Sequence, residues 1–338
     1  MRGRPADCRE RRAMLPEIIK EEKNFLRDMR SVIEPELAAH LRTGCYRGRD
    51  GTKLSYRRYE VQHEKAQILI IHGFSEFAEK YHEMVYVLLQ NGYSVFIPEL
   101  RGHGASGRKV SDRSLVDVGS FEEYLKDLHL FTVKYMPKRK APRFLLGHSM
   151  GGGIAIRYLE RYPADFDKAV LSSPMVRMQA AVLPLGLLKG MAQGLKLLGL
   201  GEKFVATTHA FAPESRLLKS SCKSRARYEY VMDMRRKAPD KQTWRADYNW
   251  TLAALDNCLR IRKHSEIAKL RTPMLVLIAG NDHMVRPEST RHFTEAVNRL
   301  RPGLCHRVEV PGGRHELYHG NEPERKLFYT RVLSFWES

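Results

Sequence analysis

The sequence predicts an α/β protein with a mostly parallel sheet, helices on both faces of the sheet, and a helical insertion. Two observations support this. Short apolar runs alternate with helical stretches along most of the chain, and the alternation stops for roughly ninety residues after Pro174. The chain has 338 residues, of which 43% are hydrophobic, so it is long enough to bury a large core around such a sheet.

The predicted elements follow in chain order. An Asp50-Gly51 turn between two short strands in residues 46–56 predicts a hairpin. The strand-like runs are 67–72, 93–98, 142–147, 168–173, 274–279 and 306–310. The predicted helices between and after them are 79–91, 119–136, 150–162, 287–300 and 322–337. Strands that alternate with helices in this way usually pair in parallel.

A separate segment precedes the hairpin. Residues 17–36 predict an amphipathic helix whose apolar stripe consists of Ile18, Phe25, Met29, Val32 and Ile33. Such a helix either packs on its own domain or lies on a membrane surface. The domain organisation that we expect is an N-terminal helical extension (1–41), an α/β core (42–174 and 266–338) and a helical cap (175–265).

The most specific motif is the pentapeptide Gly147-His148-Ser149-Met150-Gly151. A short apolar run, 143–146, precedes it, and residues with helical spacing follow it. A serine on a sharp strand-to-helix turn has its hydroxyl exposed at the top of the sheet, and the tight turn requires glycine on either side. The motif therefore predicts that Ser149 is a nucleophile. The alternative is a glycine-rich turn that carries an inert serine.

Two partners for this serine follow in the chain. Asp282 comes just after the apolar run 274–279, at the edge of the sheet where the catalytic groups of open α/β sheets gather. His315 lies on a glycine-rich loop after the run 306–310. The order Ser, Asp, His is one of those in which such triads occur. Taken alone, Asp282 could be a helix N-cap and His315 a solvated loop residue. We expect the neighbours His283 and Glu316 to support the site or to face solvent.

An oxyanion would be held by two backbone N–H groups. One belongs to Met150, the residue after the nucleophile, and the other to Phe74, in the loop after the strand 67–72. We expect no cofactor and no metal, since the sequence contains neither a metal-ligand spacing nor a phosphate-binding glycine-rich loop.

Together these motifs resemble the α/β-hydrolase family, in its branch of monoacylglycerol lipases and bacterial lysophospholipase L2. The resemblance spans about residues 42–337. It is carried by His72-Gly73-Phe74, Glu76 with Lys80-Tyr81, the run 101–107, the GHSMGG run, Gly280-Asn281-Asp282 and His315-Glu316. In one departure, Glu99-Leu100 precedes the Arg-Gly-His-Gly loop, which usually follows an Asp.

The resemblance implies an α/β-hydrolase fold, a triad of Ser149, Asp282 and His315, and an oxyanion hole from Phe74 and Met150. The spacing of Glu76, Lys80 and Tyr81 is closer to the lysophospholipase L2 side, as are the cap segments 207–209, 225–228 and 248–250. The implied enzyme is a serine carboxylester hydrolase that releases a fatty acid from a single-chain lipid, first of all a lysophospholipid. The alternatives are a monoacylglycerol lipase, a general small-ester esterase and, remotely, a non-catalytic binder of anionic lipid.

The expected cap begins with an apolar stretch, residues 175–200, rich in Met and Leu. This stretch is either an additional packed subdomain or an adaptable cover for an acyl chain, in which Leu187, Leu188 and Met191 would contact long substrates. Its longest uncharged apolar run is far shorter than the ~20 residues that cross a bilayer.

The charge is strongly positive, with 58 basic against 39 acidic residues and a net charge of +19. Ten basic and three acidic residues lie between Arg216 and Arg245, and a second basic cluster lies in residues 2–12. These charges either form a solvated surface or attract an anionic membrane. If they attract a membrane, charge reversal at Arg235, Arg236 and Lys237 should weaken membrane docking and leave hydrolysis of a soluble ester unchanged. Nucleic acid is not expected, because no nucleic-acid module occurs.

The expected location is cytoplasmic, with peripheral contact to the inner face of the membrane as the further interpretation. No apolar signal segment follows the basic N-terminus. The five cysteines are scattered and form no Cys-x-x-Cys pair, which predicts free thiols in a reducing compartment.

Overall fold

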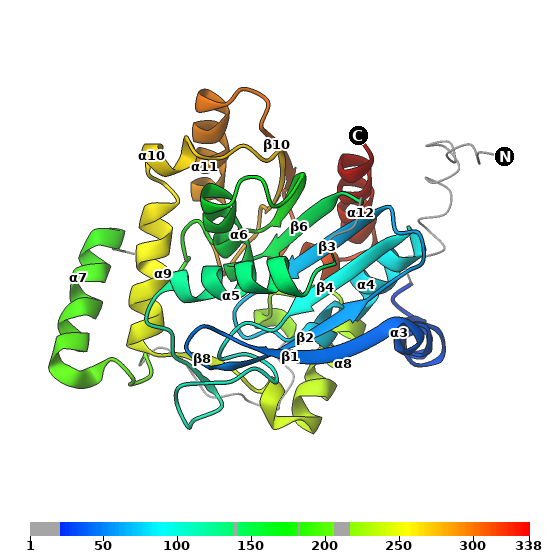
Figure 1. Cartoon of the computed structure of the whole chain (residues 1–338), viewed down its shortest axis with the longest axis horizontal. Coiled ribbons are helices and arrows are strands. Elements are labelled where there is room, and N and C mark those ends of the chain that lie inside the picture. The colour runs from blue at the N-terminus through cyan, green and yellow to red at the C-terminus, as the bar shows by residue number, and fades with distance from the viewer. Residues whose placement is uncertain (1–20, 138–140, 182, 206–216) are drawn as a thin grey trace.

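An eight-stranded sheet forms the centre of the molecule (Figure 1). The computed structural model describes residues 21–137, 141–181, 183–205 and 217–338. The strand order is β1-β2-β4-β3-β6-β7-β9-β10; the β1–β2 and β2–β4 pairs are antiparallel and the others are parallel. The strands are β1 (Leu41–Arg47), β2 (Lys53–Tyr59), β3 (Ala66–Ile71), β4 (Tyr93–Pro98), β6 (Arg143–His148), β7 (Lys168–Ser172), β9 (Met274–Ala279) and β10 (Cys305–Val310). This confirms the predicted mostly parallel sheet.

Helices cover both faces of this sheet. The core helices are α4 (His82–Gln90), α5 (Phe121–Lys134), α6 (Met150–Arg161), α10 (His264–Ile267), α11 (Pro287–Leu300) and α12 (Glu322–Glu337), with short 3-10 turns η2 (Ala78–Tyr81) and η6 (Leu317–His319). One buried apolar cluster joins the sheet to α5, α6 and α11, and a second joins its other face to α4 and α12.

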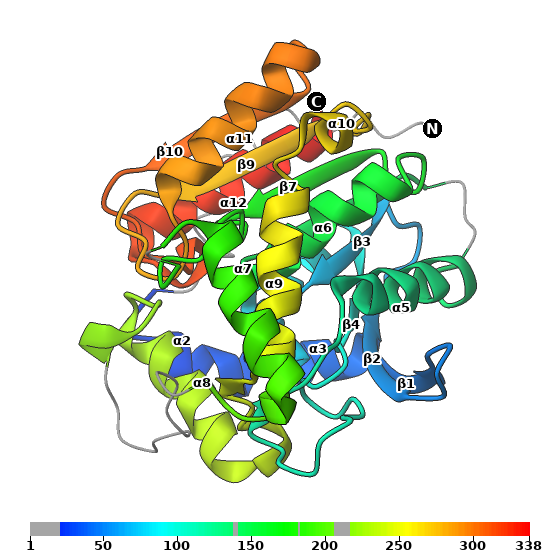
Figure 2. The same ribbon diagram turned by 90° about the vertical axis from the view of Figure 1, so that its left-hand side faces the viewer.

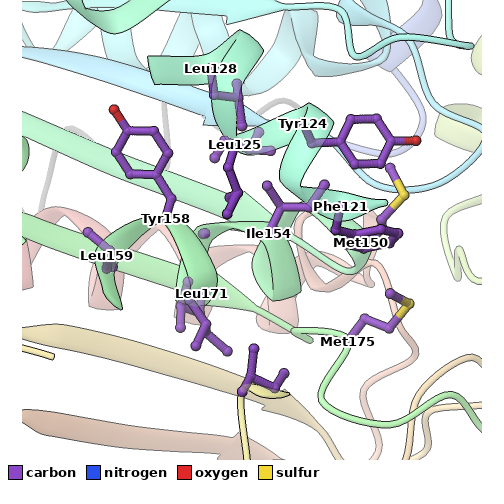
Figure 3. Close-up of a cluster of buried hydrophobic side chains, with 14 of the residues drawn as sticks. Phe121, Tyr124, Leu125, Leu128, Met150, Ile154, Tyr158, Leu159, Leu171 and Met175 are labelled. Carbon is purple, nitrogen blue, oxygen red and sulfur yellow. The ribbon is translucent and has the colours of Figure 1, made fainter. Parts of the chain in front are cut away.

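The α5–α6 side of the sheet holds the helix that follows Ser149. Figure 3 shows Phe121, Tyr124 and Leu125 of α5 facing Met150 and Ile154 of α6. Met150 and Ile154 are fully buried, so the first turn of α6 is fixed by packing directly beneath the candidate nucleophile. Four parallel strands, β3, β6, β7 and β9, are fully or almost fully buried, as expected of strands covered on both faces.

The N-terminal extension packs on the second face of the sheet. It contains α2 (Phe25–Asp28), a π-helical turn η1 (Met29–Ile33) and α3 (Glu34–His40). Phe25, Met29 and Ile33 of the predicted stripe are almost completely buried in the cluster that also holds α4 and α12, whereas Val32 is 40% exposed and Ile18 lies outside the described residues. The extension therefore packs on its own protein rather than presenting this stripe to a membrane. Residues 17–20 of the predicted helix and the basic cluster 2–12 lie outside the described residues.

The predicted cap interval contains several elements. They are α7 (Leu185–Leu195), a π-helical turn η3 (Lys196–Leu200), η4 (Leu217–Lys219), α8 (Arg225–Lys237), η5 (Pro239–Lys241), β8 (Arg245–Ala246) and α9 (Tyr248–Arg260). Figure 2 shows α7 lying along α9 at the outside of the molecule. The short strand β8 pairs in parallel with β5 (Leu115–Val116) of the core. Residues 207–209, in the cap segment singled out from the sequence, lie outside the described residues.

The two sides of α7 differ in their exposure to solvent. Leu185 and Ala192 are buried and Leu188 is half-buried against the core, but Leu187 and Met191 are 55% and 54% exposed. The helix spacing of 100° per residue places Leu187 and Met191 on the side away from α9. Leu187 and Met191 thus lie on the outer side of the cap, whereas Leu188 packs against the core.

The basic residues of the cap do not form one free basic surface. Most of those described pair with carboxylates: Lys223 with Glu324, Arg227 with Glu22 and Glu83, Arg236 with Glu229, Lys237 with Asp233, Lys241 with Glu79, and Arg245 with Asp112. Arg216 lies outside the described residues.

Arg235 is 4% exposed, and its guanidinium donates to the carbonyls of Lys241 and Ser75. Burial lowers the pKa of Arg235 to about 10. Charge reversal at Arg235 would therefore disrupt the packing of α8 rather than change a docking surface alone, which corrects the sequence-based expectation.

Two further observations concern the described part of the chain. No helix in it is long and apolar enough to span a membrane. Cys45, Cys222, Cys258 and Cys305 are free thiols, as predicted, and Cys45 is exposed while the others are buried. Cys8 lies outside the described residues.

Candidate active site

Ser149 occupies the turn between β6 and α6. Its φ of 53° and ψ of −119° are a strained combination for a residue with a side chain. The turn is held from both directions: the Ser149 N–H donates to the Ser172 carbonyl at 3.0 Å, and the Ser149 carbonyl accepts from the Met175 N–H at 2.8 Å. Ser149 is half-buried between two buried residues, His148 and Met150. This strained strand–turn–helix geometry is the one expected of a nucleophile elbow.

The glycines of the motif are required by close contacts. A Cβ on Gly151 would lie 2.1 Å from the Ile71 carbonyl oxygen, which belongs to the backbone of β3. A Cβ on Gly147 would lie 2.8 Å from the Gly151 carbonyl oxygen. These distances are too short for any side chain, so the strand–turn–helix unit can approach β3 only where glycine is present.

Asp282 and His315 form a buried pair. The His315 Nδ1 lies 2.7 Å from the Asp282 Oδ2, and the two residues are 5% and 6% exposed. The other Asp282 oxygen accepts the N–H groups of Met284 and Val285 at 2.7 and 3.0 Å. Burial alone would raise the pKa of Asp282, but the neighbouring His315 and these hydrogen bonds hold the pKa below its ordinary value. The carboxylate is thus kept ionised beside the imidazole.

The His315 loop lies against the serine turn. The His148 and His315 rings are 4.8 Å apart, and the Ser173 hydroxyl donates to the His315 carbonyl at 2.9 Å. Because Asp282 engages the Nδ1, the Nε2 of His315 remains available to a hydroxyl. The structure thus brings the loops of all three predicted catalytic residues to one place, and it places His283 at an exposed position, as expected.

The loop after β3 passes next to Ser149. A Cβ on Gly73 would lie 3.2 Å from the Ser149 Cβ, so the chain at Gly73 touches the serine. The ring of the next residue, Phe74, packs on Trp250 of α9, with the ring centroids 4.5 Å apart. Met150 begins α6, and the first N–H groups of a helix have no partner within it. The backbones of Phe74 and Met150 therefore flank Ser149.

A buried cluster of charged groups lies beside these loops. The Glu76 carboxylate accepts the Gly73 N–H at 2.6 Å and the Lys80 ammonium at 2.6 Å. Lys80 also lies 2.8 Å from the carboxylate of Glu316, the residue after His315. Burial raises the pKa of both carboxyl groups, but the charge of Lys80 outweighs it and brings the pKa of Glu76 and of Glu316 below the ordinary value. Glu316 is therefore a buried supporting residue and does not face solvent.

One group of possible metal ligands occurs among the described residues, within this cluster. It consists of Cys222, Glu316 and His319, whose ligand atoms lie within 4.8 Å of one another. Glu316 is already bonded to Lys80 and to the His319 Nδ1, and burial raises the pKa of the Cys222 thiol. A metal would need the thiolate and would lie beside the Lys80 ammonium, so we assign these residues to the hydrogen-bonded cluster.

Sequence reasoning missed the mutual contacts of Glu76, Lys80 and Glu316, and the role of Ser173. A signal was present for the first two, because an i, i+4 Glu–Lys spacing places both side chains on one side of a helical turn. Ser173, with a φ of 44°, follows the apolar strand β7 without any motif of its own.

Comparisons with known proteins give the family and the fold of the chain. The family model described as "Serine aminopeptidase, S33" matches residues 62–324. Lysophospholipase L2 of Escherichia coli is 37% identical over 133 residues, which cover 38% of each chain, so the matched part spans well under half of that relative. The monoacylglycerol lipase of Mycolicibacterium smegmatis is 29% identical over 272 residues, covering 79% of this chain and 86% of that protein.

Solved structures show the same fold. The crystal structure of Paleococcus ferrophilus monoacylglycerol lipase is 22% identical, with a TM-score of 0.64 over 84% of this chain and 97% of the other. The mostly parallel sheet of this chain, covered by helices on both faces, is the α/β-hydrolase arrangement. The chain therefore belongs to the serine aminopeptidase S33 family of α/β-hydrolases.

Proposed function

We propose that this protein is a serine carboxylester hydrolase that releases a fatty acid from a single-chain lipid, and that its main substrate is a lysophospholipid. The observation that carries the proposal is the strained Ser149 turn beside the buried Asp282–His315 pair. The names of the relatives, lysophospholipase and monoacylglycerol lipase, support a lipid ester as the substrate class. A monoacylglycerol is the second candidate, for the same reason.

The proposed mechanism uses the chain's own residues. His315 takes the proton of the Ser149 hydroxyl, and the oxygen attacks the ester carbonyl. Asp282 holds the imidazole through its Nδ1 and stabilises the charged form that results. The N–H groups of Phe74 and Met150 receive the negative charge that develops on the carbonyl oxygen. His315 then protonates the leaving alcohol, and water releases the fatty acid from the acyl-enzyme.

Replacement of the nucleophile tests this proposal. Ser149→Ala should abolish esterase activity, and a fluorophosphonate probe should label the wild-type enzyme at Ser149 only. His315→Ala should lose nearly as much activity, because triad members act as a unit and single losses cost ~10⁴-fold or more. A Ser149→Ala enzyme that keeps more than about a tenth of the wild-type rate would refute the assignment.

A substrate panel separates the candidates. Lysophospholipids, monoacylglycerols and short p-nitrophenyl esters should be compared by kcat/KM. Long single-chain esters should exceed butyrate esters, since each buried methylene can contribute ~0.8 kcal/mol until the pocket is filled. A preference for short esters would favour the small-ester esterase, and binding of anionic lipid without hydrolysis of any ester would favour a non-catalytic lipid binder.

The proposal includes peripheral contact with an anionic membrane. The support comes from the outer side of the cap, where Leu187, Met191, Leu197 and Leu198 are all at least half exposed on α7 and η3. Exposed apolar groups of this kind are typical of membrane interfaces when lysines lie nearby, as Lys196 does here. We expect binding to vesicles that contain phosphatidylglycerol, little binding to neutral vesicles, and release toward 0.5 M salt, where the Debye length falls below ~8 Å.

A further inference from the structure

The loop of the catalytic histidine and the loop of the oxyanion hole are joined by one buried cation. The Lys80 ammonium lies 2.6 Å from Glu76 on one side and 2.8 Å from Glu316 on the other. Glu76 belongs to the loop after β3, and Glu316 is adjacent to His315. All three side chains are 5–8% exposed.

Each end of this bridge is itself attached to the site. At one end, the second Glu76 oxygen accepts the Gly73 N–H at 2.6 Å and the Tyr81 hydroxyl at 2.5 Å, and Gly73 touches Ser149. At the other end, Glu316 binds the His319 Nδ1 at 2.9 Å, and its N–H donates to the Ser221 carbonyl at 3.1 Å.

Stability alone gives a weak reason for such a bridge. Taking two carboxylates and an ammonium out of water carries a desolvation penalty that often cancels their attraction, and apolar replacements are frequently as stable. The fixed directions of the hydrogen bonds have a different consequence, because they hold two loops in one relative position. Displacement of a reacting group by about 1 Å can reduce a rate on the order of 10²-fold.

We propose that Glu76, Lys80 and Glu316 form a positioning bridge, which holds His315 and the Phe74 N–H in register with Ser149 for the hydrolysis reaction. The inference rests on the proposed function, since it takes Ser149 and His315 as the reacting groups. None of the three residues contacts the substrate in this proposal, so they act on kcat rather than on substrate binding.

Lys80→Met is the main test, because the variant keeps the side-chain length and removes the cation. With a soluble p-nitrophenyl ester, kcat should fall on the order of 10²-fold while KM changes less than about twofold. The rate of labelling by a fluorophosphonate should fall in parallel. Lys80→Arg, which keeps the charge and can bind both carboxylates, should recover most of the lost rate.

Glu316→Gln provides a second variant that keeps the shape of the site if Lys80→Met folds poorly. It should also lower kcat at unchanged KM. The double variant Lys80→Met/Glu316→Gln should lose no more than Lys80→Met alone, because residues of one bridge are not additive. The matched control is Glu83→Gln, which weakens the buried Glu83–Arg227 pair between α4 and α8 and should lower Tm without lowering kcat.

Three outcomes would overturn the proposal. The first is an unchanged kcat in both folded variants. The second is a rise in KM with kcat intact, which would indicate contact with the substrate. The third is an equal loss of kcat in the Glu83→Gln control. Ser149→Ala is measured with the same ester. If that enzyme is inactive and the bridge variants behave as wild type, the positioning role fails and the proposed function stands; if Ser149→Ala remains active, the proposed function fails first.

Discussion

Phe25→Ala tests whether the N-terminal extension is an integral part of the fold. Phe25 is 1% exposed in the cluster with α4 and α12, and its ring lies 4.1 Å from the guanidinium carbon of Arg227 on α8. Truncation of a buried Phe to Ala costs about 3–5 kcal/mol. Loss of the cation–π contact with Arg227 moves the expected value toward the upper part of that range.

The size of the protein converts this cost into a melting temperature. An unfolding entropy of about 2.1 cal/mol/K per residue gives about 0.7 kcal/mol/K for 338 residues. Phe25→Ala should therefore lower Tm by about 4–7 °C in differential scanning calorimetry. The matched control is Leu26→Ala, because Leu26 is the next residue but 39% exposed, and it should shift Tm by less than about 1 °C. Equal melting of the two variants would refute the packing argument, as would a loss of vesicle binding by Phe25→Ala at unchanged Tm.

Further predictions concern the site and the cap. Gly151→Ala should abolish esterase activity and lower Tm, because its Cβ would meet the Ile71 carbonyl oxygen at 2.1 Å; full activity would contradict the elbow geometry. Asp282→Asn should lower kcat ~10⁴-fold with little change in KM, as measured with a soluble ester. The pKa of Asp282 is lower in the folded state, so its ionised form stabilises the fold above the unfolded pKa of ~3.9. This stabilisation is lost as the pH falls through the folded pKa. Acid unfolding of Asp282→Asn, followed by circular dichroism, should therefore lack the part of the pH dependence that comes from Asp282. Leu187→Ser with Met191→Ser should weaken binding to phosphatidylglycerol vesicles and leave hydrolysis of acetate esters unchanged, whereas Leu188→Ser should lower Tm.

The sheet was predictable from the sequence because its central strands are apolar on both faces and lie between helical segments. Each predicted strand overlaps the observed one to within a residue or two; β6, for example, is Arg143–His148 against the predicted 142–147. The helix expected at 79–91 begins instead as a 3-10 turn, Ala78–Tyr81, where Lys80 is bonded to Glu316, which is distant in sequence. Tertiary contacts of this kind leave little trace in local periodicity.

The candidate site was predictable as far as its residues lie in motifs at strand ends. Ser149 and Asp282 follow the buried strands β6 and β9, and His315 follows the neighbouring edge strand β10, so the approach of their loops at one edge follows from the parallel sheet. The exposed side of α7 and the burial of Arg235 were not predictable, since a run of Leu and Met or of Arg and Lys reads alike whether it faces the core or solvent. Their orientation depends on α9 and on the Ser75 carbonyl, which are distant in sequence.

The contact between the N-terminal extension and α8 also has a consequence for how the chain folds. Glu22 accepts the Ala226 N–H at 2.9 Å, in the first turn of α8, and pairs with Arg227 at 3.0 Å, across a sequence separation of 205 residues. Closing a loop of that length carries an entropic penalty that other contacts must first reduce, and long-range contacts of this kind form slowly. The extension, although it is synthesised long before α8, therefore packs late in folding. During synthesis the apolar side of α2 has no completed surface to cover until more than two hundred further residues have followed.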